Sequence, residues 1–146
     1  MPEVHVNNNR PDLDGPLSRT FNDVIENRAS DDSEIEALLE EMSGLGFNPV
    51  NASPGHSIVI LMYCKTVDDA VRFTQHFNSG RVQYILESIL NRLLLKIEPH
   101  NTETLDSCVS LDEEDIVALE KFTGIEGISL KILSTDLFSS SNCNYL

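Results

Sequence analysis

The residue types best suited to catalysis or metal binding in this chain are four histidines and three cysteines, and they are scattered. His5, His56, His76 and His100 stand at no metal-ligand spacing from one another or from a cysteine. The zinc-protease pattern HExxH, the hydrolase pattern GxSxG and the nucleotide-binding pattern GxxxxGK[ST] are all absent. The sequence therefore predicts no catalytic residue, no cofactor-binding residue and no metal site.

The acidic run Asp112-Glu113-Glu114-Asp115 is the densest group of oxygen ligands. It lacks the alternating spacing and the glycine of an EF-hand calcium loop. Ser110 and Glu113 have the spacing of a helix capping box. We therefore interpret these carboxylates as the first turn of a helix, where they interact favourably with the positive end of the helix dipole.

The cysteines Cys64, Cys108 and Cys143 form no CxxC motif and no cluster with histidine, which predicts no zinc site. Cys64 closes an apolar run, so we interpret it as a buried thiol rather than a nucleophile, which would need a nearby base and a lowered pKa. The N-terminus lacks the basic-then-apolar pattern of a signal peptide. Together these features predict a reducing, cytoplasmic setting.

The chain is acidic, and its length suits one domain. Its 146 residues carry 10 Lys and Arg against 24 Asp and Glu, a net charge of −14. This charge argues against binding to nucleic acid, which lysine and arginine hold, and against docking on anionic lipid. No apolar run reaches the roughly 18 residues that a membrane span needs. Residues 1–43 and 98–146 each carry a net charge of −8, while residues 56–97 carry +2, the pattern expected of acidic helices around a neutral core.

Apolar spacing defines the elements that would position these side chains. Helical spacing predicts helices over residues 16–29, 33–42, 67–79 and 82–93, and a further helix from Ser110 to Phe122. Capping boxes formed by Ser33 with Glu36 and by Thr66 with Asp69 mark the starts of the second and third of these helices. The apolar run 58–63 predicts a central strand covered on both faces, and the run 94–98 predicts another strand. Residues 48–55, with two prolines, are expected to form an irregular connection.

The order of these elements predicts an α/β (α+β) sandwich, with a small, mainly antiparallel sheet of three to four strands and helices mainly on one face. We expect residues 1–15 to form a flexible arm or a short edge strand, residues 16–134 a single domain, and residues 135–146 a loose tail. A last strand over residues 128–132 alternates in hydropathy. Its solvent-exposed face would carry Ser129 and Lys131, which we predict to contact a protein partner.

From Ile58 onward the order of features resembles the N-terminal domain of the TNF-receptor-associated death-domain adaptor (TRADD). The resemblance covers residues 33–133. It lies in the strand 58–64, in Phe73 and Phe77 on a helix closing at Gly80, in the leucine-rich helix 82–93, and in the strand 95–98. These are packing residues, so no binding residue is carried over. The resemblance implies a non-enzymatic α/β sandwich that binds the TRAF domain of a downstream adaptor in cytoplasmic apoptosis or innate-immune signalling.

Three hypotheses for function remain open. The first is a protein-interaction (adaptor) domain that uses its sheet and acidic surface, with a TRAF-type adaptor as the partner. The second is a small enzyme or ligand-binding domain whose site forms only in three dimensions, around Cys64, His56 or His76. The third is an acidic decoy that mimics nucleic acid and binds a basic protein. We expect the first, with no cofactor, no nucleic acid and no membrane contact.

Overall fold

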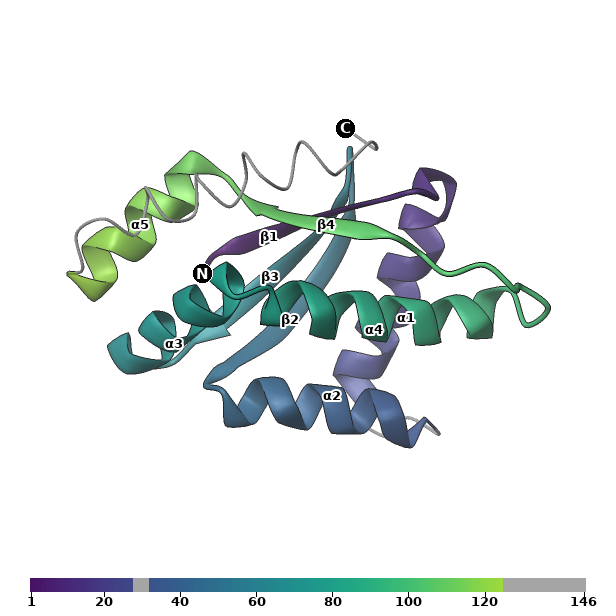
Figure 1. The fold of residues 1–146 in the computed structure, drawn as a ribbon, viewed down its shortest axis with the longest axis horizontal. Coiled ribbons are helices and arrows are strands. Elements are labelled where there is room, and N and C mark those ends of the chain that lie inside the picture. Colours follow the sequence, from purple (N-terminus) through teal and green to yellow (C-terminus); the bar gives the residue numbers. More distant parts are fainter. Residues whose placement is uncertain (28–31, 125–146) are drawn as a thin grey trace.

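The computed structural model describes residues 1–27 and 32–124 of the chain (Figure 1). In chain order, the elements are β1 (Glu3–Asn8), the 3₁₀ turn η1 (Pro11–Leu13), α1 (Asp14–Asn27), α2 (Ser33–Gly44), β2 (Phe47–Pro54), β3 (Ile58–Cys64), α3 (Val67–Asn78), α4 (Arg81–Ile97), β4 (Ser107–Leu111) and α5 (Glu113–Thr123).

The four strands form one antiparallel sheet in the order β2-β3-β1-β4. In Figure 1, α4 runs across the strands, and α5 lies beyond one end of the sheet, near the N-terminus. The helices pack against the sheet, so the predicted α+β sandwich with a small antiparallel sheet is confirmed.

A single hydrophobic core lies between the sheet and the helices. Alternate residues of β1 and β3, such as Val4, Ile60 and Met62, point into it and are fully buried. The longest helix, α4, contributes a stripe of seven buried apolar residues at helical spacing. These residues are Val82, Ile85, Leu86, Ile89, Leu90, Leu93 and Leu94.

Helix caps explain where several elements begin. Thr66 and Asp69 form the capping box expected at the start of α3, because each side chain accepts a hydrogen bond from the other residue's backbone N–H. At α2 the cap is Asp32 instead of the expected Ser33, and its carboxylate accepts from the backbone of Glu34 and Ile35.

The expectation that residues 1–15 form a flexible arm or an edge strand is wrong. β1 pairs with β3 on one side and with β4 on the other, so it lies inside the sheet, and η1 and the start of α1 follow it directly. The reason is β4 (Ser107–Leu111), a short strand that overlaps the predicted start of a helix at Ser110. Ser110, read as a helix cap, lies in β4 opposite His5.

Two further segments differ from expectation. Residues 48–55 are largely strand β2, an edge strand whose register shifts between Pro49 and Asn51, where the missing proline N–H is tolerated. Residues 94–97 continue α4 as helix instead of forming a strand. Leu94 extends the buried stripe by one helical turn from Leu90, so packing on the core decides a choice that local propensity left open.

Candidate functional site

The register of the sheet separates its residues into two faces. Cross-strand partners in an antiparallel pair point to the same side. The partners of the buried Val4 are Ile60 and Leu111, so all three face the helices. The partners of His5 are Val59 and Ser110, and these three point to the opposite side, where all are partly exposed.

We call this opposite side the outer face. Its centre is the apolar row Val59, Leu61 and Tyr63 on β3, and its flanks are polar. β3 was expected to be covered on both faces, but Tyr63 is 46% exposed. The flanking residues are Glu3, His5 and Asn7 on β1, Asn51 and Ser53 on β2, and Ser110 on β4.

Tyr63 lies between two hollows at the end of β3. The first, of about 300 Å³, lies between β3, the N-terminus and α5, and is lined mainly by apolar side chains that include Met1, Leu119 and the half-exposed Phe122. The second, of about 400 Å³, is polar and includes Lys65 and Arg72. An exposed aromatic ring beside an apolar hollow, and beside a polar hollow that holds Lys65 and the Arg72–Asp69 ion pair, is suited to contact a protein surface.

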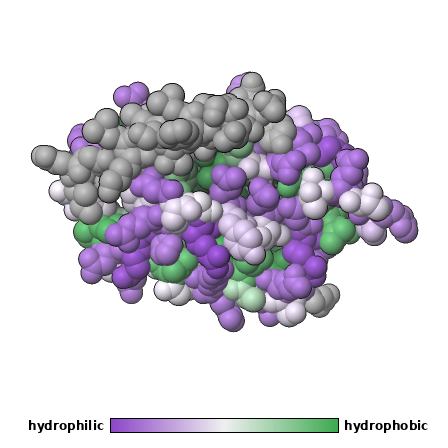
Figure 2. Space-filling model, viewed as in Figure 1, coloured by the Kyte–Doolittle hydropathy of each residue, from purple (hydrophilic) through white to green (hydrophobic). Residues whose placement is uncertain are grey.

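The helical side of the molecule, where α4 and α2 lie nearest the viewer in Figure 1, has a different surface composition from the outer face. Figure 2 shows mostly hydrophilic residues there, with hydrophobic residues in separate spots. On α4, Tyr84 and Leu95 are exposed large hydrophobic residues. Tyr84 is a matched control for Tyr63, and Leu95 for Leu61, because each has the same side chain but lies away from the outer face.

Cys64 is a poor nucleophile. Its thiol is partly buried, and burial together with the charge of Asp69 raises its pKa to about 11. Because the thiolate is the reactive form, this thiol is almost entirely protonated at neutral pH. The prediction that Cys64 is a structural thiol agrees with this environment.

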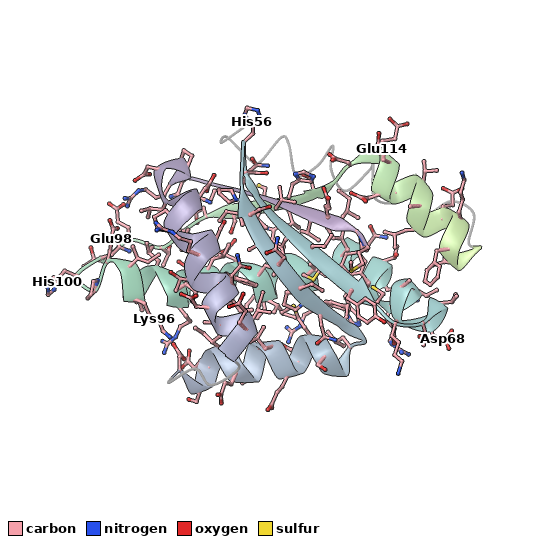
Figure 3. The ribbon with its side chains drawn as sticks, turned by 180° about the vertical axis from the view of Figure 1, so that it is seen from behind. His56, Asp68, Lys96, Glu98, His100 and Glu114 are labelled. Atoms are coloured by element: carbon pink, nitrogen blue, oxygen red, sulfur yellow. The ribbon has the colours of Figure 1, made fainter. Side chains whose placement is uncertain are left out.

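His56 and His76, the two histidines named in the enzyme hypothesis, lie on different elements. His56 lies in the exposed turn between β2 and β3 and points outward, as does His100 at another corner of the molecule (Figure 3). His76, on α3, is half-buried with its ring 6.4 Å from that of Phe47. Each of the three occupies a separate environment.

His5 makes the contacts most relevant to chemistry. Its Nε2 lies 3.0 Å from a carboxylate oxygen of Asp112, and its Nδ1 lies 3.4 Å from the hydroxyl of Ser57. The order serine, histidine, aspartate resembles a hydrolase triad. Ser57, however, is only 6% exposed, so a substrate cannot reach its hydroxyl, and the array holds the β2–β3 turn and the start of α5 against β1.

No local pattern in the sequence marks this cluster, because His5 and Asp112 are 107 residues apart and meet only through the pairing of β1 with β4. The acidic run does start α5, as expected, with Glu113, Glu114 and Asp115 in its first turn. Burial raises the pKa of Asp115, the nearby Glu3 and Asp112 charges add to this, and a hydrogen bond from the Glu3 backbone opposes it.

Ser129 and Lys131, predicted to contact a partner, lie outside the described residues, as do the strand 128–132 and the tail 135–146. Among the described residues, no helix is both long and apolar enough to cross a membrane. No family model, curated protein or solved structure matches this chain.

Proposed function

We propose that this chain is a non-enzymatic protein-interaction domain that binds its partner through the outer face of the sheet. One observation carries the proposal. The apolar row Val59, Leu61 and Tyr63 runs along a strand whose other face already supplies the core, and it ends in an aromatic ring that is 46% exposed. Folding does not require apolar side chains at these positions, whereas a buried interface does.

The surroundings of the row favour a protein partner over a small molecule. The row is flanked by polar side chains, which is the arrangement of an interface with an apolar centre and a polar rim. At its end, Phe122 and Met1 add exposed apolar surface around the neighbouring hollow. Tyrosine and phenylalanine bury large areas at low entropic cost, so Tyr63 and Phe122 are the expected anchors of the contact.

We further propose that the partner is the TRAF domain of a TRAF-type adaptor, and that the complex acts in cytoplasmic apoptosis or innate-immune signalling. The support is the resemblance of the core to the N-terminal domain of TRADD. The described order β1-α1-α2-β2-β3-α3-α4-β4, with β3 followed by two helices, is compatible with that resemblance. One feature of the resemblance, a strand over residues 95–98, is absent, because residues 94–97 belong to α4. The proposed partner therefore rests on the resemblance, and the proposed binding surface rests on the outer face.

The test is the affinity of the purified full chain for a purified TRAF domain, measured by isothermal titration calorimetry. Tyr63→Ala is expected to weaken binding at least about tenfold, because truncating an interface anchor costs more than about 1.4 kcal/mol. Tyr84→Ala, which removes an even more exposed tyrosine ring from α4, is expected to bind like the wild type.

Two results would contradict the proposal. Failure of the wild-type chain to bind any TRAF domain tested would refute the proposed partner. To test the surface separately, a photo-crosslinking phenylalanine analogue would be placed at position 63 or at position 84 and irradiated in cell lysate. Equal protein adducts from the two positions, or none from position 63, would refute the outer face as the interaction surface.

A further inference from the structure

The cluster around His5 lies at the polar flank of the outer face, and its chemistry suggests a role beyond the proposed protein contact. One ligand atom each from Glu3, His5 and Asp112 lies within 4.8 Å of the other two. Glu3 and His5 are on β1, and Asp112 precedes α5. The sheet therefore brings together an imidazole nitrogen and two carboxylate oxygens from opposite ends of the described chain.

We propose that Glu3, His5 and Asp112 form a binding site for a divalent transition-metal ion of the zinc type. Zinc is bound by imidazole nitrogen and carboxylate oxygen at about 2.0–2.2 Å, so the ligand atoms around one ion lie about 3–4 Å apart. The 3.0 Å separation of His5 Nε2 and Asp112 Oδ2 is already in this range. Glu3 and Asp112 are exposed and free to adjust their rotamers.

The orientation of His5 supports metal binding independently of the carboxylates. The buried Ser57, on the connection before β3, contacts Nδ1 from outside the cluster and leaves Nε2 directed at Asp112. A metal-binding histidine typically donates its second ring N–H to a neighbouring polar group, and the hydroxyl oxygen of Ser57 can accept such a bond from Nδ1 when Nε2 binds the ion. Ser57 is thus a positioning residue for the proposed site.

The local charge also favours a cation. Glu3, Asp112 and the neighbouring Asp115 place three carboxylates around one imidazole. In the described part of the chain, the arginine ion pairs are made elsewhere, by Arg10, Arg72, Arg81 and Arg92, and none reaches these three carboxylates. A divalent ion would offset this charge, and the imidazole nitrogen selects zinc over calcium and magnesium, which prefer oxygen ligands alone.

The test is calorimetric titration of the full chain with zinc chloride, with calcium and magnesium chloride as parallel arms. We expect saturable binding of one zinc ion and no competition from the other two ions. His5→Ala and Asp112→Asn are each expected to weaken zinc binding more than about tenfold, and Ser57→Ala by about tenfold or more. His56→Ala and Glu114→Gln, which alter exposed residues outside the cluster, are the matched controls and should leave the affinity unchanged.

A second readout covers the chance that a variant folds poorly. Cobalt(II) in the site gives visible absorption bands from its nitrogen and oxygen ligands, and circular dichroism of each variant reports whether it is folded. Folded Asp112→Asn should lose the cobalt bands, while Glu114→Gln should keep them. The proposal is overturned if the wild type shows no saturable zinc binding, or if folded His5→Ala and Asp112→Asn bind zinc as well as the wild type does.

Discussion

The side chains on the two faces of the sheet differ in burial and in role. On β3, Ile60 is fully buried beneath the helices, while its neighbour Leu61 points to the outer face and is only partly buried. On β1, Val4 and Val6 are fully buried, while His5 between them contacts a serine and a carboxylate. The inner face is devoted to packing, so the apolar and titratable residues of the outer face are available for recognition.

The largest expected effect compares adjacent residues on β3. Ile60→Ala should lower the free energy of unfolding by about 2–5 kcal/mol, because it removes a fully buried side chain and leaves a cavity. Leu61→Ala should cost less than about 1.5 kcal/mol, because Leu61 is already partly exposed. Urea unfolding followed by circular dichroism measures both, and equal losses would show that both faces of β3 are core.

A smaller loss of unfolding free energy is expected at Asn22, where α1 contacts the edge strand β2. The side-chain amide of Asn22 on α1 donates to the carbonyl of Ala52 at 2.7 Å, and its oxygen accepts from the N–H of Ala52 at 2.8 Å. It therefore acts as a substitute strand partner for β2. Asn22→Ala should destabilise the fold by about 1–3 kcal/mol, because it leaves backbone groups of β2 unpaired.

Asn51→Ala is the matched control, since Asn51 is an exposed asparagine on the outer face of the same strand. Its expected effect on the free energy of unfolding is within about 0.5 kcal/mol. If thermal and urea unfolding showed a larger loss of stability for Asn51→Ala than for Asn22→Ala, the structural role assigned to Asn22 would be contradicted.

The smallest effect concerns reactivity and leaves stability unchanged. Cys64 lies at the end of β3, and with a pKa of about 11, against 9.0 for an ordinary thiol, it should hold about 100-fold less thiolate at pH 8. Its alkylation by iodoacetamide, followed by peptide mass spectrometry, should be correspondingly slow and should rise about tenfold per pH unit up to pH 10. A rate that levels off below pH 9 would mean an activated thiol and would revive the enzyme hypothesis.

Much of the fold could be predicted, because strong local signals coincide with tertiary packing. The apolar run of β3 and the Thr66–Asp69 capping box of α3 both lie where the sequence placed them. Residues 94–97 were misread because a short apolar run fits a strand or a buried helix equally well. β2 was misread because its prolines signal a loop unless Asn22 is known to lie beside it.

The candidate site was harder to predict than the fold. Tyr63 is part of an apolar run in which inner and outer residues are the same type, so only strand register identifies the outer row. The contact between His5 and Asp112 depends on β4, which has five residues and no clear alternating pattern in its sequence. Contacts made by long-range strand pairing leave no local trace in the sequence.

Recognition through the outer face is best tested by the affinity of a folded Leu61→Asp variant for the TRAF domain, with Leu95→Asp on α4 as control. We predict that the free energy of unfolding of Leu61→Asp is within about 1.5 kcal/mol of the wild-type value, and that this variant binds at least about tenfold more weakly, because a charge replaces an apolar contact of the outer face. Leu95→Asp should bind like the wild type. Wild-type affinity of folded Leu61→Asp would contradict the assignment of recognition to the outer face.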